Sequence, residues 1–471
     1  MGPKELTLLR SSDAPGLENS GDNVDPSTTS SYPDSKLDGK QGAVTTAASG
    51  MALSTNQNKE PEWAHGFQLF NILTAVTFVC FLMLLDGTIV VAAVPCHVLI
   101  VTRVAQLGLA SGPLFGGLLT QYATWRWCFY LNLPVGGLVA VMLVFVRIPQ
   151  QHPRPPPLSV VRSLHTSLDL LGFLIFAPAL LMLLLALEWG GTEYAWNSSQ
   201  IIGLFCGAGS TFIVFLLWDY HKGDAALLPF SIARRRAVWS SCFVYGLFMG
   251  NLYTASYWVP VYFQEVKGAS PTMSGVYILP MIIAHVFAAL SSGPIVNKLG
   301  YYTPVALFAA VLLSVGSGLI STFSPNTLTG KWIGYQILYG PGRGLGLQIP
   351  LLNVQNTVPP QQLPIAMALT IFSQSFGAAV FLSLAETIFS NRSQNLITGY
   401  APSVNAQSII DAGATGFRQI VSGTDLAGVL IAYAESIDRF FYLAAGMGAG
   451  CFIFAMAMGW KNLKRKSVPK V

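Results

Sequence analysis

The chain has 471 residues, of which 52% are hydrophobic and only 10% are charged. Soluble domains carry about 25% charged residues, so the composition excludes an ordinary soluble protein and predicts an all-α polytopic membrane protein. The net charge of +5 is not gathered into a basic stripe or a recognition motif. It therefore disfavours nucleic acid as a partner and is expected to lie in cytoplasmic loops.

Residues 1–62 differ in composition from everything that follows. They are rich in Ser, Thr, Gly, Asp and Pro and contain few large apolar side chains. Such a segment cannot bury enough surface to fold, so it is predicted to be a disordered cytoplasmic tail. No apolar segment near Met1 looks like a cleaved signal peptide, so we expect the first span to direct membrane insertion.

The rest of the chain divides into apolar segments long enough to span a bilayer, which takes about 20 residues. We expect about 11 transmembrane helices. They are predicted near 67–101, 104–121, 131–147, 168–187, 201–218, 238–263, 273–293, 302–323, 331–352, 363–389 and 440–460.

Charges between these segments predict their orientation. Lys and Arg gather in 148–167, in 219–237 and after residue 460, which places these stretches on the cytoplasmic side. The opposite side is expected to hold a polar loop over 390–439. Asn197 and Asn391 begin N-x-S/T sequons on that outer side, so both are candidate glycosylation sites.

The first span conflicts with this orientation. A cytoplasmic tail and a cytoplasmic Arg103 require residues 67–101 to cross the membrane an even number of times. As a single helix these residues would be about 52 Å long, which is too long for one comfortable span and short for two. Composition alone does not resolve the conflict.

Several stretches resemble one protein family. LDGTIVVAAVP (85–95), ASGPLFGG (110–117) and KWIGYQILYGPGRGLGLQIP (331–350) are similar to signatures of the fourteen-helix drug:proton antiporter branch of the major facilitator superfamily, in its fungal form. In that family three helices separate the first two signatures, whereas about a dozen residues do here. Loss of three helices would produce the conflict just described, so 96–103 is predicted to be a deletion seam. The resemblance covers roughly 67–460.

The resemblance implies a domain organisation. It consists of an incomplete N-terminal helical bundle (67–147), a two-helix insert (168–218), a six-helix C-terminal bundle (238–460) and a basic cytoplasmic tail (461–471).

Four polar residues within predicted spans are candidates for proton coupling or substrate binding. Charge inside a membrane is costly and commonly functional. Asp86 is a candidate proton-titrating or substrate-binding group, or a helix-packing acid. Arg343 is expected to face the bundle interior or a watery cavity, as an anion-binding group or a structural anchor. Glu386 and Gln348 could act as ligands or as partners in interhelical hydrogen bonds.

Glycine-rich segments have two interpretations. The motif that contains Gly108, Gly112, Pro113, Gly116 and Gly117 resembles the antiporter motif of the family, where it implies a hinge and a leak barrier. The alternative is ordinary packing of small residues. The glycines that flank Arg343 permit either local unwinding or tight packing.

Asp169, at the start of a span, is predicted to cap its helix.

No catalytic constellation is present in the sequence. The six cysteines and six histidines are scattered, so neither a metal site nor a cofactor is indicated. His285, within a span, is predicted to be a helix–helix hydrogen-bond partner. The missing Walker A motif disfavours an ATP-driven pump, and the family implies a proton gradient as the energy source.

The sequence therefore predicts a non-enzymatic transporter. By resemblance it performs proton-coupled efflux of a small hydrophobic or amphipathic compound, such as a drug, toxin or secondary metabolite. The expected partners are a small-molecule substrate, the proton gradient and the lipid bilayer, with the chain a monomer in the plasma membrane or, as second choice, the vacuolar membrane. The alternative is a truncated remnant that does not transport.

Overall fold

The computed structural model describes residues 116–124, 126–130, 133, 169–191 and 193–462. These residues form helices joined by turns, with one isolated bridge between Gly190 and Tyr194 and no strand among them. All of the described residues fall in one of the two units into which the chain divides, the one that begins at Phe70. Asp86, the seam at 96–103 and the tail over 1–62 lie outside the described residues, so their predictions stay predictions.

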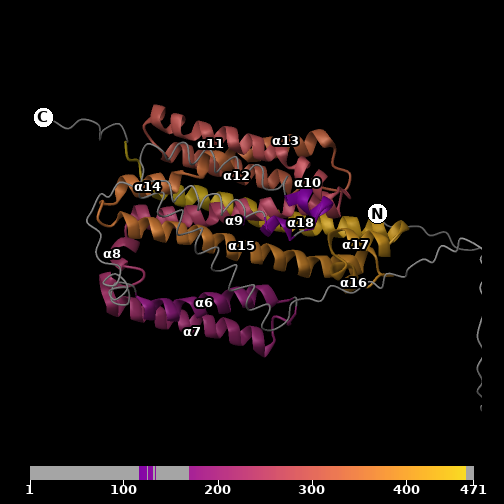
Figure 1. The fold of residues 1–471 in the computed structure, drawn as a ribbon, viewed down its shortest axis with the longest axis horizontal. Coiled ribbons are helices and arrows are strands. Elements are labelled where there is room, and N and C mark those ends of the chain that lie inside the picture. Colours follow the sequence, from indigo (N-terminus) through magenta and orange to yellow (C-terminus); the bar gives the residue numbers. More distant parts are fainter. Residues whose placement is uncertain (1–115, 125, 131–132, 134–168, 192, 463–471) are drawn as a thin grey trace, which may run out of the picture. The chain divides into compact units, whose positions relative to one another are not determined.

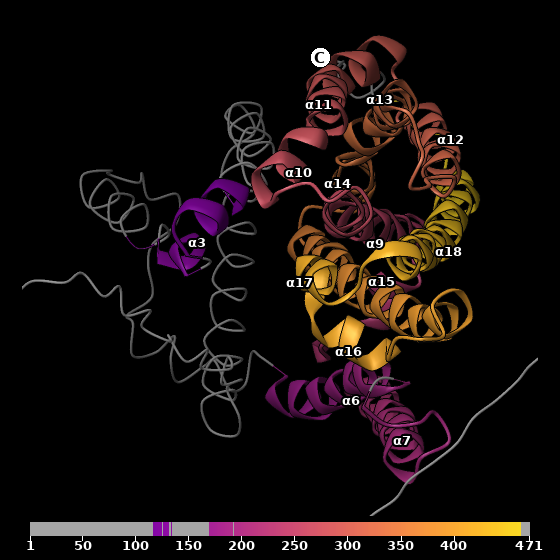
Figure 2. The ribbon, with the colours of Figure 1, turned by 90° about the vertical axis from the view of Figure 1, so that its right-hand side faces the viewer.

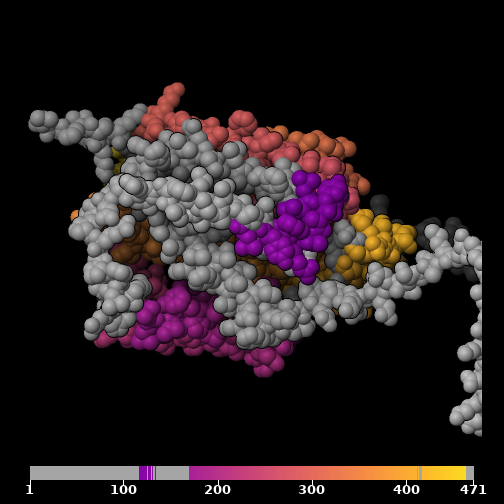
Figure 3. Space-filling model, in the orientation of Figure 1, coloured from indigo at the N-terminus to yellow at the C-terminus, as the bar shows by residue number. Residues whose placement is uncertain are grey.

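Two antiparallel helices form the predicted insert (Figure 1): α6 (Leu170–Trp189) and α7 (Ser199–Lys222). The hydroxyl of Ser198 caps α7 by accepting a hydrogen bond from Ile201 N at 3.3 Å. Both helices turn large apolar side chains outward, as lipid-facing helices do. The exposed apolar side chains include Leu174, Leu181, Ile213 and Leu217. The insert helices are magenta in the space-filling view of Figure 3.

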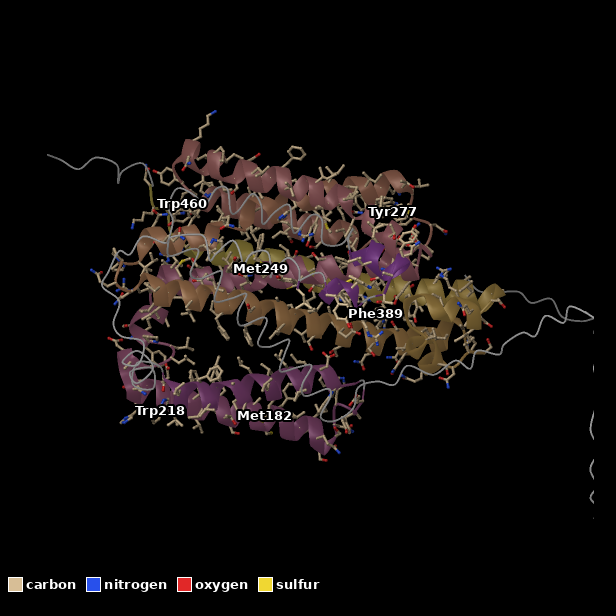
Figure 4. The ribbon with its side chains drawn as sticks, in the orientation of Figure 1. Met182, Trp218, Met249, Tyr277, Phe389 and Trp460 are labelled. Atoms are coloured by element: carbon tan, nitrogen blue, oxygen red, sulfur yellow. The ribbon has the colours of Figure 1, made fainter. Side chains whose placement is uncertain are left out.

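The carboxylate of Asp169 ties the predicted cytoplasmic ends of both insert helices together. It caps α6, as predicted, by accepting a hydrogen bond from Gly172 N at 3.0 Å. It also accepts hydrogen bonds from Trp218 Nε1 at 3.1 Å (Figure 4), Lys222 Nζ at 3.2 Å and Leu227 N at 3.2 Å. Burial by itself would raise the pKa of this carboxyl, but the hydrogen bonds and the charge of Lys222 together lower the pKa below its usual value.

We expect Asp169→Asn to destabilise the helix pair by about 1.5–3 kcal/mol, the contribution of a hydrogen bond to a charged group. Because the folded pKa is lowered, the charge stabilises fully above about pH 4 and its contribution is lost as the pH falls through the folded pKa. The difference in melting temperature between wild type and variant should be large near neutral pH and vanish in acid. Asp224→Asn, at an exposed acid nearby, is the control. A difference that does not change with pH would contradict the assignment.

The C-terminal bundle is built from long helices that pack along each other (Figure 2). The central helix α9 packs against α15 and α18, α11 packs against α13, and α12 packs against α13 and α18. Their bounds are α9 (Arg236–Glu265), α10 (Pro271–Tyr277), α11 (Leu279–Leu299), α12 (Thr303–Ile320), α13 (Thr329–Gly346), α14 (Ile349–Thr357), α15 (Leu363–Tyr400) and α18 (Gly423–Ala457).

Aromatic side chains fill the core between α9, α15 and α18. The ring of Trp258 lies 4.5 Å from that of Phe389 and 4.8 Å from that of Phe440, measured between ring centroids. Trp258 is 2% exposed. Such offset aromatic contacts add to the stability that burial provides.

The prediction of a polar loop over 390–439 is wrong. Helix α15 continues to Tyr400, two short helices follow, α16 (Ala406–Asp411) and α17 (Gly413–Ile420), and α18 already begins at Gly423. An α15 of 38 residues is about 57 Å long, well beyond the roughly 30 Å of bilayer hydrocarbon. Polar residues end the apolar segment without ending the helix. A prediction based on the length of the apolar segment therefore places the end of the helix too early.

Within the described residues, six helices are long and apolar enough to cross a membrane: α6, α7, α11, α12, α15 and α18. Helices α9 and α13 occupy two further predicted spans and pack among them. The all-helical polytopic fold is therefore confirmed.

Candidate functional site

Arg343 lies inside the C-terminal bundle, as predicted. Its residue is only 3% exposed. The guanidinium donates a hydrogen bond from Nη2 to Ser256 Oγ at 2.8 Å and lies 5.7 Å from the centre of the Tyr339 ring. Its Nε has no hydrogen-bond partner among the described residues. The side chain thus links α13 to α9, and its Nε–H remains available to a ligand.

A buried polar network continues from Tyr339. The Tyr339 hydroxyl donates to Asn251 Oδ1 at 2.5 Å, and Asn251 Nδ2 donates to Ser317 Oγ at 3.1 Å and to Ala444 O at 2.7 Å. Four helices, α9, α12, α13 and α18, meet in this network. Buried networks of this kind rigidify a core when every member is satisfied, so the surroundings of Arg343 serve at least a structural purpose.

The glycines around Arg343 pack two faces of α13 tightly. A Cβ atom on Gly340 would lie 2.6 Å from Met281 O of α11, and one on Gly344 would overlap His285 O of the same helix. A Cβ on Gly342 would lie 2.8 Å from Leu313 N of α12. The helix remains regular through Gly346, so tight packing, rather than unwinding, explains these glycines.

Gln348 is not brought together with Arg343. It stands between α13 and α14 and is partly exposed. Its side chain makes no hydrogen bond to another described residue, so its assignment as a ligand stays a prediction.

The insert brings a second acid to the stretch of α15 that carries Glu386. Glu188, near the end of α6, accepts a hydrogen bond from Ser383 Oγ at 3.1 Å, and Thr387 Oγ1 donates to Leu187 O at 2.7 Å. These contacts fix the end of α6 on the stretch of α15 that carries Glu386. The negative charge of Glu188 acts on Glu386. The docking of α6 on α15 therefore brings one acid of the insert and one acid of the C-terminal bundle within electrostatic reach of each other, and we call them the Glu188–Glu386 pair.

Sequence reasoning missed two members of this site. Glu188 lies one residue beyond the predicted span 168–187 and belongs to α6, which ends at Trp189. The half-exposed Tyr257 of α9 lies within the electrostatic reach of Glu386, Glu265 and Glu188. An acid at the end of an otherwise apolar helix, as Glu188 is, was the signal in the sequence.

The end of the predicted antiporter motif contacts the C-terminal bundle. Residues 116–122 are helical, and Thr272 at the start of α10 donates from Oγ1 to Gly117 O at 3.3 Å and from N to Gln121 Oε1 at 3.2 Å. A Cβ on Gly117 would lie 2.6 Å from Pro271 O, while one on Gly116 would meet nothing within 4 Å. Gly117 thus marks a close approach of two backbones. Gly108, Gly112 and Pro113 lie outside the described residues.

Gly117→Val should destabilise this contact by about 1–3 kcal/mol, the cost of overpacking, because the opposing atoms are backbone and cannot turn away. Gly116→Val, with open space at its Cβ, is the matched control and should melt like wild type. The comparison uses the melting temperature of each purified variant in detergent. Equal melting of the two variants would show that the contact contributes nothing to stability.

The two sequons lie in different surroundings. Asn197 is exposed in the turn between α6 and α7, as a glycan acceptor should be. Asn391 lies within α15, donates from Nδ2 to Thr387 O at 2.9 Å, and packs against Gly191. Glycosylation stays a prediction for both, and the geometry favours Asn197.

The described residues contain no group of three or more His, Cys, Asp or Glu that could hold a metal ion. His285 is 2% exposed on α11 and lies within the electrostatic reach of Arg343. Its role as a helix–helix hydrogen-bond partner stays a prediction.

Comparison with known proteins identifies the family. The model of the Major Facilitator Superfamily matches residues 98–382. The chain belongs to this superfamily. It is 52% identical over 366 residues to the MFS-type transporter pigP of Monascus ruber, with 78% of this chain and 64% of that protein aligned. It is 45% identical over 393 residues to the efflux pump mlcE of Penicillium citrinum, with 81% of this chain and 71% of that pump aligned.

The chain thus spans less than two thirds of the length of the Monascus ruber transporter. Transporters of the major facilitator superfamily hold substrate and coupling ions between two helical halves. In this member, Gly117 of the predicted N-terminal bundle contacts Thr272 of the C-terminal bundle. Glu188 of the insert contacts Ser383 of the C-terminal bundle. The fourteen-helix assignment and the roles of the site residues stay predictions.

Proposed function

We propose that the chain is a membrane transporter that exports a small hydrophobic or amphipathic compound in exchange for protons. The observation that carries the proposal is the docking of the end of α6 on α15, which brings Glu188 within electrostatic reach of Glu386. The similarity to a protein named an efflux pump supports the direction.

Two close carboxylates suit exchange of a proton for a cation or a neutral substrate. Their mutual repulsion is relieved when one of them binds a proton or when a cation lies between them. A movement that changes the separation of the two carboxylates would change their affinity for a proton. Asp86, in the first predicted span, is proposed as a second proton-binding group.

Alternating access requires the two halves to rock against each other. The contact of Gly117 and Gln121 with the start of α10 supports the motif as the hinge and seal of that movement. Arg343, with its spare Nε donor, is proposed to bind an anionic part of the substrate or to anchor the second half.

We extend the proposal to the setting of the protein. The chain is a monomer and not an enzyme, and it acts in the plasma membrane or, failing that, the vacuolar membrane. Its substrate is a xenobiotic or secondary metabolite, since extended apolar helix faces suit such compounds better than sugars. No nucleic acid takes part.

Cellular accumulation of a lipophilic fluorescent compound tests the proposal against the alternative of a remnant that does not transport. Yeast that expresses the full chain should accumulate less compound than cells with empty vector, and collapse of the proton gradient should remove the difference. Equal accumulation with and without the protein, at confirmed surface expression, would favour the remnant.

A further inference from the structure

A polar pocket opens between α15 and α18, and neither Glu188 nor Glu386 is among its described lining residues. Its volume is about 450 Å³, and the described residues that line it are Ile388, Asn391, Arg392, Asn395 and Arg439. Two of these residues are basic and none is acidic. A cleft lined by charges of one sign attracts the opposite charge, so a pocket with two guanidinium groups favours a negatively charged ligand.

Neither arginine is neutralised by an ion pair within the described residues. The ion pair that the structure shows there is Lys222–Asp169, in the insert. The Nε atom of Arg392 is buried and has no hydrogen-bond partner among those residues. Arg439 is exposed and its guanidinium lies 5.9 Å from the centre of the Tyr442 ring. Both side chains therefore have donors available for a ligand.

Two acids of α18, Glu435 and Asp438, lie near Arg439 in the chain but are not among the described lining residues. Glu435 accepts a hydrogen bond from the Tyr400 hydroxyl at 2.9 Å. Asp438 precedes Arg439 in α18 and interacts with it electrostatically, but it is not among the described lining residues. The amides of Asn391 and Asn395 each donate one hydrogen bond within α15, which leaves each a second N–H.

The predicted spans place the pocket at the depth of lipid headgroups. Arg392 follows the outer end of the predicted span 363–389 by three residues, and Arg439 directly precedes the outer end of the predicted span 440–460. Both arginines belong to helices that continue past these predicted ends, α15 and α18. A molecule could therefore place its charged group between the arginines and its apolar part along Ile388.

We propose that this pocket binds the phosphate or carboxylate group of an anionic amphipathic molecule. Arg side chains bind such groups through paired N–H donors, and the asparagine amides can complete the set. The source is either an outer-leaflet lipid headgroup or a soluble amphiphile. The inference does not depend on transport, because binding to this surface requires no movement of the two halves.

The test uses the full chain purified in neutral detergent and titrated with three probes: phosphatidylglycerol, phosphatidylcholine and octyl phosphate. Melting temperature reports binding. Arg392→Gln/Arg439→Gln removes both charges, and Lys331→Gln, at an exposed base on the same predicted side, is the matched control. We expect wild type and control to prefer anionic probes, and the double variant to bind them at least about tenfold more weakly.

The pattern across probes identifies the source. Binding of phosphatidylglycerol but not of octyl phosphate indicates a lipid site, and binding of both indicates a site for soluble anionic amphiphiles. Equal binding of phosphatidylcholine and phosphatidylglycerol, or unchanged binding by the double variant, would overturn the proposal. If the double variant misfolds, Arg439→Gln alone decides, since its side chain is exposed and its loss should leave the fold intact.

Discussion

Gly344→Leu should destabilise the C-terminal bundle by about 3 kcal/mol, near the upper end of what overpacking costs. A Cβ on Gly344 would overlap His285 O and lie 2.6 Å from Ala289 N, both backbone atoms of α11. Neither atom can rotate aside, so α11 and α13 would have to separate. Separation would also break the contact between Gly340 and α11 one turn away. We expect a lower melting temperature and loss of monodisperse protein in detergent.

Gly334→Leu is the matched control in the same helix. Gly334 is exposed, and a Cβ there would meet nothing within 4 Å. Because leucine favours a helix over glycine by about 1 kcal/mol, this variant should melt at or slightly above the wild-type temperature. Equal destabilisation at both positions would mean that helix α13 does not pack on α11 as described.

Glu386→Gln is expected to reduce proton-driven export to the level of vesicles without protein. Glutamine keeps the size and the hydrogen-bonding capacity of the side chain but cannot bind and release a proton. It also removes the repulsion with Glu188, so the fold should be unharmed. Export driven by the substrate's own concentration gradient should persist, because that process needs no proton.

Glu193→Gln provides the control, since Glu193 is an exposed acid in the turn that follows α6. Its export should equal that of wild type. Glu188→Gln should weaken proton-driven export as well, if the pair acts as a unit. Full activity of Glu386→Gln would place the coupling group elsewhere, with Asp86 the next candidate.

The sequence predicted helices better than it predicted their ends. Apolar segments located α6, α7, α11, α12 and α15, because about 20 apolar residues leave few alternatives to a spanning helix. They failed for 390–439, where α15 and α18 continue as helices beyond the predicted spans 363–389 and 440–460. There the tertiary contacts stabilise a polar helix. One such contact is the ring of Phe417 against that of Tyr433, at 5.2 Å between centroids.

For the site residues, burial could be predicted from the sequence but contact partners could not. The buried position of Arg343 could be predicted from its charge within an apolar span, since such a group must face the protein interior. Its partner Ser256 could not, because residues distant in the chain meet only through the packing of α9 on α13. The pairing of Glu386 with Glu188 was hidden for the same reason, as it depends on how the insert docks on α15.

The most direct test of the account measures proton movement itself. The full chain is reconstituted in liposomes that enclose a pH-sensitive dye. A lipophilic compound that is exported in the cellular assay is then added outside, with the same pH on both sides of the membrane. The account predicts a change in internal pH that accompanies compound movement in wild type and in Glu193→Gln, and is absent in Glu386→Gln. Compound movement with no change in pH in the wild-type protein would contradict proton coupling.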